Sequence, residues 1–243
     1  TAATAAFLQM YADIDQYHNL IGREVNLRWG DDSGFANNPN VLRYLWRMFG
    51  AEGDAVIDRI DRENIALNIM SHLILPVAKP LCEAFGNRLK IIEIVRHPLY
   101  MFSHWEAYLS RFLGPREFTP SFDHHGQKVP WFAIEWADQY VNMTIADRSL
   151  ASIDCLYRKL VDSIDYLDLC GASLHVASFE QVVLLTDSEM ERLAEFLGRR
   201  HHPRLKKILA RQKLPRKRIT HGKGHAAYGW QAGKEESEKG EYL

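Results

Sequence analysis

The stretch Leu89–Val95 is a short run of mostly apolar and branched residues that leads directly into Arg96, His97 and Pro98. This pattern predicts a buried strand ending in an arginine, followed by a helix over Leu99–Leu113. Proline fits the first turn of a helix because its missing N–H would have no partner there. Free N–H groups at a helix start attract anions, and Arg96 and the Ser103 hydroxyl add two further donors. The segment therefore predicts a phosphate-binding site at the end of a central strand.

Strands and helices are expected to alternate along the chain, which favours an α/β fold whose mostly parallel sheet is flanked by helices. Strands are expected at 17–26, 65–69, 89–95 and 173–178. Helices are expected at 1–10, 41–49, 54–62, 77–85, 99–113, within 131–169 and at 188–197, the last capped by Asp187 or Ser188 and stopped by Gly198. The stretch 114–130, rich in proline, is expected to be a long loop covering a site.

The chain of 243 residues is long enough for one α/β domain with a sizeable core. No apolar run approaches the roughly 20 residues of a membrane span, and no signal peptide is visible. The three cysteines form no pattern typical of disulfides or zinc, which favours core thiols in a reducing, cytoplasmic compartment. The chain begins at Thr1 without a methionine, inside an expected helix, so an upstream segment is expected to be missing.

The net charge of −1 hides a strong asymmetry. Residues 1–198 carry 17 Lys/Arg and 27 Asp/Glu, whereas residues 199–234 carry 12 Lys/Arg and no acid. A basic segment on an acidic body indicates a local anionic partner rather than nucleic acid. A solvated basic tail is the alternative.

Three segments, in order, resemble the sulfotransferase family, whose members transfer a sulfuryl group from 3′-phosphoadenosine 5′-phosphosulfate. Residues 71–76 (SHLILP) are similar to the Thr-His-Leu-Pro segment of the cytosolic members, and residues 96–103 to the arginine and serine that bind the 3′-phosphate, with a spacing of seven instead of eight. Residues 222–230 (GKGHAAYGW) are similar to the late Arg-Lys-Gly-x-x-Gly-x-Trp loop, with one residue inserted. A weaker similarity to the same family is found in Ala177-Ser178-Phe179-Glu180, followed by the Phe-Leu-Gly of residues 196–198.

The resemblance implies a P-loop-type three-layer fold over one domain, 1–243, and a sulfotransferase that uses 3′-phosphoadenosine 5′-phosphosulfate without a metal. His72 would be the catalytic base. The 3′-phosphate would be bound by Arg96, Ser103, Lys223 and Gly224, with Arg218 as a second cation, so that the basic segment 199–243 contributes to the site. The family's N-terminal phosphate loop is not present in the sequence; Thr1 resembles its last threonine, in which case the first strand and loop precede the chain.

Sulfuryl transfer, like phosphoryl transfer, is catalysed mainly by positioning and charge stabilisation, and a histidine suits the removal of the acceptor's proton at neutral pH. Glu24 and His18 are weaker base candidates. Trp105 and Trp230 could stack on adenine or belong to the core, and His124, His125 and Trp131 lie in or beside the expected cover loop.

The acceptor, a small molecule or glycan with a hydroxyl or amine, is not readable from the sequence, and neither is the oligomeric state. Two other function classes stay open. A P-loop kinase of nucleotides or small molecules would share the sheet and the anion site, but it requires a Walker lysine and a magnesium-binding acid. A sulfotransferase-like protein without catalysis would keep the 3′-phosphate half of the site alone.

Overall fold

The structure, a computed structural model, describes residues 1–243 except 30–33, 39, 51, 113–118 and 220–243. It is mixed α/β and mostly helical. The strands are β1 (Lys90–Val95), β2 (Ser121–His124), β3 (Gln127–Pro130) and β4 (Ser173–Ser178). The α-helices are α1 (Ala2–Leu20), α2 (Val41–Trp46), α3 (Asp54–Glu63), α4 (Lys79–Phe85), α5 (Pro98–Leu109), α6 (Ala137–Asn142), α7 (Ile145–Cys170), α8 (Phe179–Leu184), α9 (Thr186–Leu197) and α10 (Leu205–Arg211). Short 3-10 helices are η1 (Phe35–Asn37), η2 (Arg47–Phe49), η3 (Leu75–Val77), η4 (Gly86–Arg88) and η5 (Trp131–Trp136).

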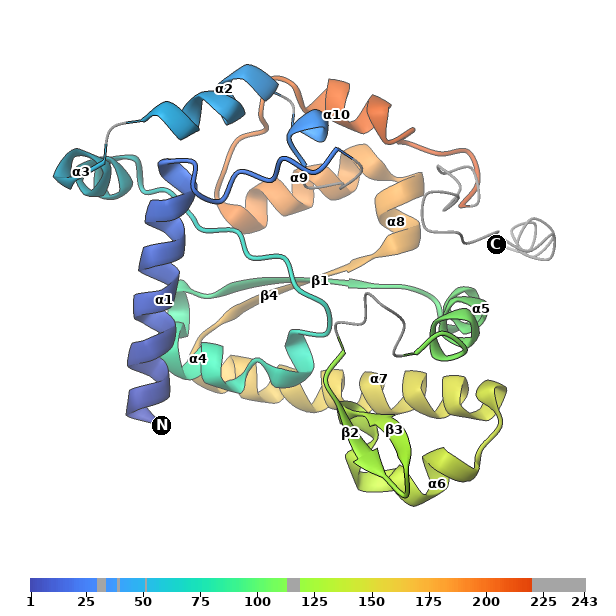
Figure 1. Ribbon diagram of the computed structural model, residues 1–243. Coiled ribbons are helices and arrows are strands. Elements are labelled where there is room, and N and C mark those ends of the chain that lie inside the picture. The colour runs from blue at the N-terminus through green and yellow to red at the C-terminus, as the bar shows by residue number, and fades with distance from the viewer. Residues whose placement is uncertain (30–33, 39, 51, 113–118, 220–243) are drawn as a thin grey trace.

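The central sheet pairs β1 with β4 in parallel, in register from Lys90 opposite Ser173 to Val95 opposite Ser178. Both strands and their parallel pairing are confirmed, and β4 has the predicted bounds. Helices α4 and α7 lie on one side of the sheet and α8 and α9 on the other (Figure 1). Among the described residues this sheet has two strands, so the larger mostly parallel sheet expected from the sequence is not seen there.

Two expected strands are wrong. Residues 17–20 belong to α1, which ends near Gly22, where the backbone adopts a φ of 76°. Residues 65–69 form no strand. The carbonyl of Ile65 accepts a hydrogen bond from the Gln16 side chain, and that of Asn64 accepts one from Arg199 at 2.7 Å. Side chains thus bind backbone carbonyls that a strand would use for hydrogen bonds to a neighbouring strand.

The long helix α7 connects the two main apolar clusters. Toward its start, Ile153 and Leu156 pack with the core of α5 and η5 around Trp105 and Phe132. Toward its end, Leu167 packs with Leu75, Cys82 and Ile91 beneath β1, among others. The helix ends at Gly171, whose left-handed φ of 73° suits glycine. The predicted helical stretch 131–169 is confirmed as η5, α6 and α7.

Residues 121–130 form a β-hairpin rather than the expected loop; residues 113–118 lie outside the described part. Strands β2 and β3 pair antiparallel, and Phe122 and Val129 face the core around Trp105. Between the strands stand His125 and Gly126, with φ of 50° and 76°. Positive φ at both positions is typical of a two-residue hairpin turn, whose twist matches the strands. The hairpin was not predicted because His is less common than Asn at the first position of such a turn.

Two short helices, α8 and α10, were not predicted. The side chain of Ser178 caps α8 by accepting a hydrogen bond from the N–H of Gln181 at 3.4 Å. Helix α9 ends at the left-handed Gly198, as predicted, but begins at Thr186 without the expected Asp187 or Ser188 cap. Of the helices that the structure describes, none has both the length and the apolar character required to span a membrane.

Candidate anion-binding site

Arg96 directly follows β1, so it lies at the carboxyl end of the parallel sheet, as predicted. Because β1 and β4 are parallel and in register, the residues after β4 meet it there. The Tyr157 hydroxyl donates a hydrogen bond to the Arg96 carbonyl at 2.6 Å. The His97 N–H donates to the Glu180 carboxylate at 3.1 Å, and the Ser178 hydroxyl donates to the same carboxylate at 2.8 Å. These bonds fix both strand ends together.

Two arginines gather at this end of the sheet around one aromatic ring. The guanidinium carbon of Arg96 lies 5.0 Å from the centre of the Phe179 ring, and that of Arg216 lies 5.8 Å from it. Arg216 is held in place by its own backbone: its N–H donates to the Val183 carbonyl at 2.7 Å. Its side chain donates to the Ile219 carbonyl at 3.0 Å. A guanidinium on an aromatic face is favoured electrostatically, so Phe179 orients both cations.

Both arginines retain unused hydrogen-bonding capacity. Within the described part of the chain, the Nε atoms of Arg96 and Arg216 are buried without a hydrogen-bond partner, and neither guanidinium forms an ion pair. Burial, followed by the charge of Arg96, lowers the pKa of Arg216. A buried donor without a partner is costly, and two neighbouring cations repel each other. An anion bound between them would relieve both costs.

Glu180 balances part of this positive charge. Burial is the largest single influence on its carboxyl group and raises the pKa. The hydrogen bonds from Ser178, from its own N–H and from His97, together with the charge of Arg96, outweigh burial and hold the pKa below its usual value. Glu180 is therefore a carboxylate at neutral pH. Two arginines against one carboxylate leave the site cationic.

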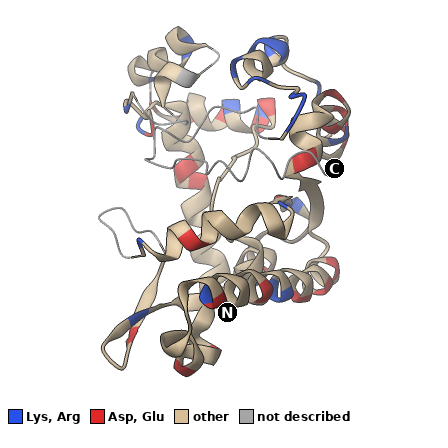
Figure 2. Cartoon of the chain, turned by 90° about the vertical axis from the view of Figure 1, so that its right-hand side faces the viewer, with Lys and Arg blue, Asp and Glu red and all other residues tan. Residues whose placement is uncertain are grey.

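The basic C-terminal segment reaches this site. Figure 2 shows lysines and arginines gathered along α10 and the chain that follows it, close to α8. Arg216 belongs to this segment and brings its charge to the sheet end. Arg218, predicted as the second cation, is exposed two residues further on and interacts with other residues of the chain. The structure thus places Arg216, which the sequence analysis did not single out, beside Arg96.

The other residues predicted to bind the cofactor are Ser103, Lys223 and Gly224 for the 3′-phosphate and Thr1 for the N-terminal phosphate loop. Ser103 is exposed on the second turn of α5, the helix that begins two residues after Arg96. Thr1 caps α1 by accepting from the Thr4 N–H at 3.2 Å, and the terminal amine lies 3.5 Å from Glu83 on α4. In Figure 1 this end of α1 lies across the molecule from α5. Lys223 and Gly224 lie outside the described residues, as does Trp230.

His72 is exposed in the segment between α3 and η3. Its neighbour Leu73 packs against the core of α5, and Leu75 packs against Ile91 of β1. The segment that follows His72 therefore leads from the core around α5 to the apolar cluster beneath β1. The alternative bases lie in another segment: His18 is on the last turn of α1, and Glu24 is exposed four residues beyond the end of that helix.

Trp105 is buried in the core and contacts Phe132 edge to face, with ring centroids 5.8 Å apart. Of its two predicted roles, the core role is therefore the one observed.

A separate hollow beneath the sheet is lined by Pro76, Lys79, Trp131 and Tyr166, among others. Its lining includes neither Arg96 nor His72, so it is distinct from the arginine pair.

Comparison with known proteins gave no match, whether to a family model, a curated protein or a solved structure. The site is therefore described by its own chemistry: two partly buried guanidinium groups, an aromatic ring that both of them contact and a carboxylate that joins the strand ends. Sequence reasoning missed Arg216, Phe179 and Tyr157 as parts of it. The available signals were the basic segment around Arg216 and the strand-end position of Phe179.

Proposed function

We propose that this chain is a sulfotransferase that binds 3′-phosphoadenosine 5′-phosphosulfate and transfers its sulfuryl group to a hydroxyl or amine of a small molecule or glycan. The observation that carries the proposal is the pair Arg96 and Arg216 at the carboxyl end of the parallel sheet. In open α/β sheets this edge is where ligands bind. The three free cysteines fit a reducing compartment such as the cytoplasm.

The arginine pair would bind the 3′-phosphate of the nucleotide. The phosphate oxygens would accept hydrogen bonds from the Nε atoms that have no partner among the described residues. Each charge-assisted hydrogen bond is worth about 1.5–3 kcal/mol. In this proposal the two-stranded sheet is the centre of a P-loop-type three-layer fold, and Lys223 and Gly224 complete the phosphate site.

His72 would act as the base. Its exposed imidazole is accessible to an acceptor, and the two leucines that follow it anchor the backbone, Leu73 on the core around α5 and Leu75 on the cluster beneath β1. The acceptor's oxygen or nitrogen attacks sulfur, the bond from sulfur to the bridging oxygen breaks, and His72 takes the acceptor's proton. Adenosine 3′,5′-bisphosphate is then the leaving product. A positioned base of this kind contributes about 10²–10⁴-fold to the rate.

The nucleotide specificity of the full chain tests this function. Calorimetry should show that adenosine 3′,5′-bisphosphate binds about tenfold or more tightly than adenosine 5′-monophosphate, which lacks the 3′-phosphate. ATP with magnesium should bind more weakly than the bisphosphate. Equal affinity for the two adenosine nucleotides would contradict the proposal, and tighter, magnesium-dependent ATP binding would support the kinase alternative instead.

Turnover tests the role of His72. Release of adenosine 3′,5′-bisphosphate from the sulfuryl donor would be followed with a panel of phenols, alcohols, sugars and amines. His72→Ala should lower turnover about 10²–10⁴-fold and leave product-nucleotide affinity unchanged. The matched control is His201→Ala, a second exposed histidine far along the chain. Full turnover in His72→Ala would exclude it as the base, and nucleotide binding without turnover on any acceptor would favour a non-catalytic binding protein.

A further inference from the structure

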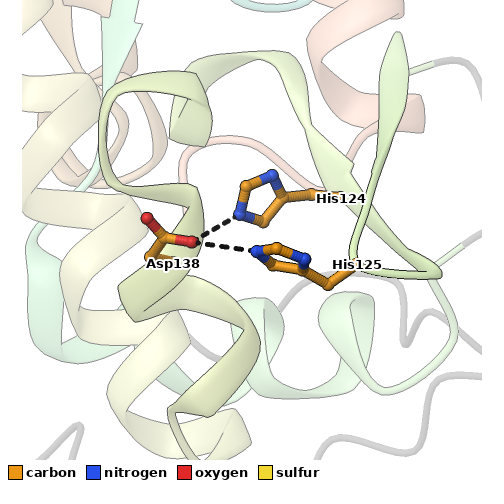
Figure 3. Close-up of side chains that lie close together, drawn as sticks. All are labelled: His124, His125 and Asp138. Carbon is orange, nitrogen blue, oxygen red and sulfur yellow. Dashed lines mark hydrogen bonds and ion pairs between the residues drawn. The ribbon is translucent and has the colours of Figure 1, made fainter.

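The hairpin and α6 bring together three side chains that the sequence analysis did not combine. His124 and His125 both direct an Nε2 atom at the same carboxylate oxygen of Asp138, at 2.7 and 3.4 Å (Figure 3). The two imidazole rings lie 4.3 Å apart, edge to face. All three potential ligand atoms lie within 4.8 Å of one another.

This convergence depends on the turn of the hairpin. Consecutive residues of a strand point to opposite faces, so two adjacent strand histidines would diverge. His124 ends β2, and His125 occupies the first turn position with a left-handed φ of 50°. That conformation is uncommon for a residue with a side chain. It turns the second ring to the side of the first, so that both reach Asp138.

The three side chains project from elements that are packed on the hydrophobic core. Phe122, two residues before His124, packs on the core with Val129, which is fully buried on the opposite strand. Asp138 lies on the first turn of α6, whose Tyr140 belongs to the same core. The ligands therefore come from two elements anchored on one cluster. His125 and Asp138 are themselves exposed, so an ion can enter from solvent.

We propose that His124, His125 and Asp138 form a binding site for a divalent transition-metal ion of the Zn²⁺ type. Two imidazoles and one carboxylate are a donor set that suits zinc, with water in the fourth position. A tetrahedral ion with bonds of about 2.0–2.1 Å places its ligand atoms about 3.3 Å apart. The contact of His125 with Asp138 already has this separation, and that of His124 with Asp138 must open by roughly 0.6 Å.

Binding replaces the His124–Asp138 hydrogen bond and the His125–Asp138 contact with three coordinate bonds, one from each residue. The Nε2 atom of each histidine must carry no proton to bind the ion, so the ring proton resides on Nδ1. The Asp138 carboxylate, which now shares its Oδ1 with both rings, supplies the negative charge. Mg²⁺ and Ca²⁺, which prefer oxygen ligands, fit this set poorly. The inference is independent of the sulfotransferase proposal.

Cobalt(II), which replaces zinc and absorbs visible light, is the probe for the test. Titration of the full chain should show one equivalent of Co²⁺ bound with tetrahedral absorption bands, displaced by Zn²⁺ and unaffected by millimolar Mg²⁺. His125→Asn and Asp138→Asn should each weaken binding at least tenfold. His125→Asn is well matched because Asn also accepts the left-handed turn, so the hairpin is retained while the imidazole is lost.

The control is the second adjacent pair, His201 and His202, which lies after α9 and whose double alanine variant should bind Co²⁺ normally. Far-ultraviolet circular dichroism of every variant confirms that the fold is retained. Absence of binding by the wild type would overturn the proposal. So would unchanged affinity in His125→Asn and Asp138→Asn, or an intense sulfur-to-cobalt band, which would place the ion on the cysteines.

Discussion

Replacing Glu189 should destabilise the fold strongly, because this carboxylate is almost fully buried, at 2 % exposure. Its two oxygens accept hydrogen bonds from His175 on β4, at 2.7 Å, and from Arg192 one turn further along α9, at 2.9 Å. The bond to His175, a side chain that is 10 % exposed, is the larger contribution. It joins α9 to the strand whose end carries the arginine site.

The magnitude for Glu189→Ala follows from the two bonds. Loss of the charge-assisted bond to His175 costs about 1.5–3 kcal/mol, and the histidine left without its partner adds about 1 kcal/mol. Arg192 is 53 % exposed and regains water, so its bond adds less than about 1 kcal/mol. The total is about 3 kcal/mol of unfolding free energy. Glu189→Gln, which keeps the shape and one acceptor, should cost about half as much.

Urea denaturation followed by circular dichroism measures this effect. With a slope of about 3 kcal/mol per molar urea, Glu189→Ala should lower the midpoint by about 1 M without changing the slope. The control is Glu191→Ala, an exposed glutamate on the same helix, which should stay within about 0.5 kcal/mol of the wild type. If Glu189→Ala also stayed within that range, the bonds to His175 and Arg192 would not stabilise the fold as argued.

Two further predictions concern glycine and cysteine positions. Gly22→Ala should cost about 2 kcal/mol or more in denaturation, because the new Cβ would meet the Met48 nitrogen at 2.5 Å and the φ of 76° strains an L-residue. Gly198→Ala, which has the same kind of φ but nothing within 4 Å, should cost about 1 kcal/mol, and equal losses at both sites would refute the steric argument. Burial, followed by the neighbouring thiol of Cys170, raises the pKa of Cys82 to about 12. Cys82 should therefore resist alkylation at pH 8 in the native chain and react after unfolding, which mass spectrometry of the labelled peptides would show; rapid native labelling would contradict this.

Much of the central framework could be predicted from local sequence. The apolar run of β1, the strand β4 and the left-handed glycines at 171 and 198 are signals contained within a few residues. The wrong predictions concern segments whose conformation is set by contacts with residues far away in the sequence. The expected strand at 65–69 is not formed: the Gln16 side chain takes the carbonyl of Ile65, and Arg199 takes that of Asn64 just before it, which no local pattern reveals.

The residues of the candidate sites likewise differ in whether local sequence could predict them. Arg96 could be predicted because the end of a buried parallel strand is a local feature with a known place in the fold. Arg216 could not be singled out, because only the packing of the basic segment on α8 selects it from the many cations nearby. Asp138 joins His124 and His125 only once the hairpin folds against α6. Metal ligands were therefore not expected from the sequence.

The central claim is that Arg96 and Arg216 together bind the 3′-phosphate of an adenosine nucleotide. Calorimetry with adenosine 3′,5′-bisphosphate should show that Arg96→Ala and Arg216→Ala each weaken binding by about 1.5–3 kcal/mol, or roughly tenfold or more. Arg158→Ala, which removes an exposed arginine paired with Asp154 on α7, should bind normally. The loss in both arginine variants should largely disappear for adenosine 5′-monophosphate. Unchanged affinity for the bisphosphate in either variant, or an equal loss for both nucleotides, would contradict the account.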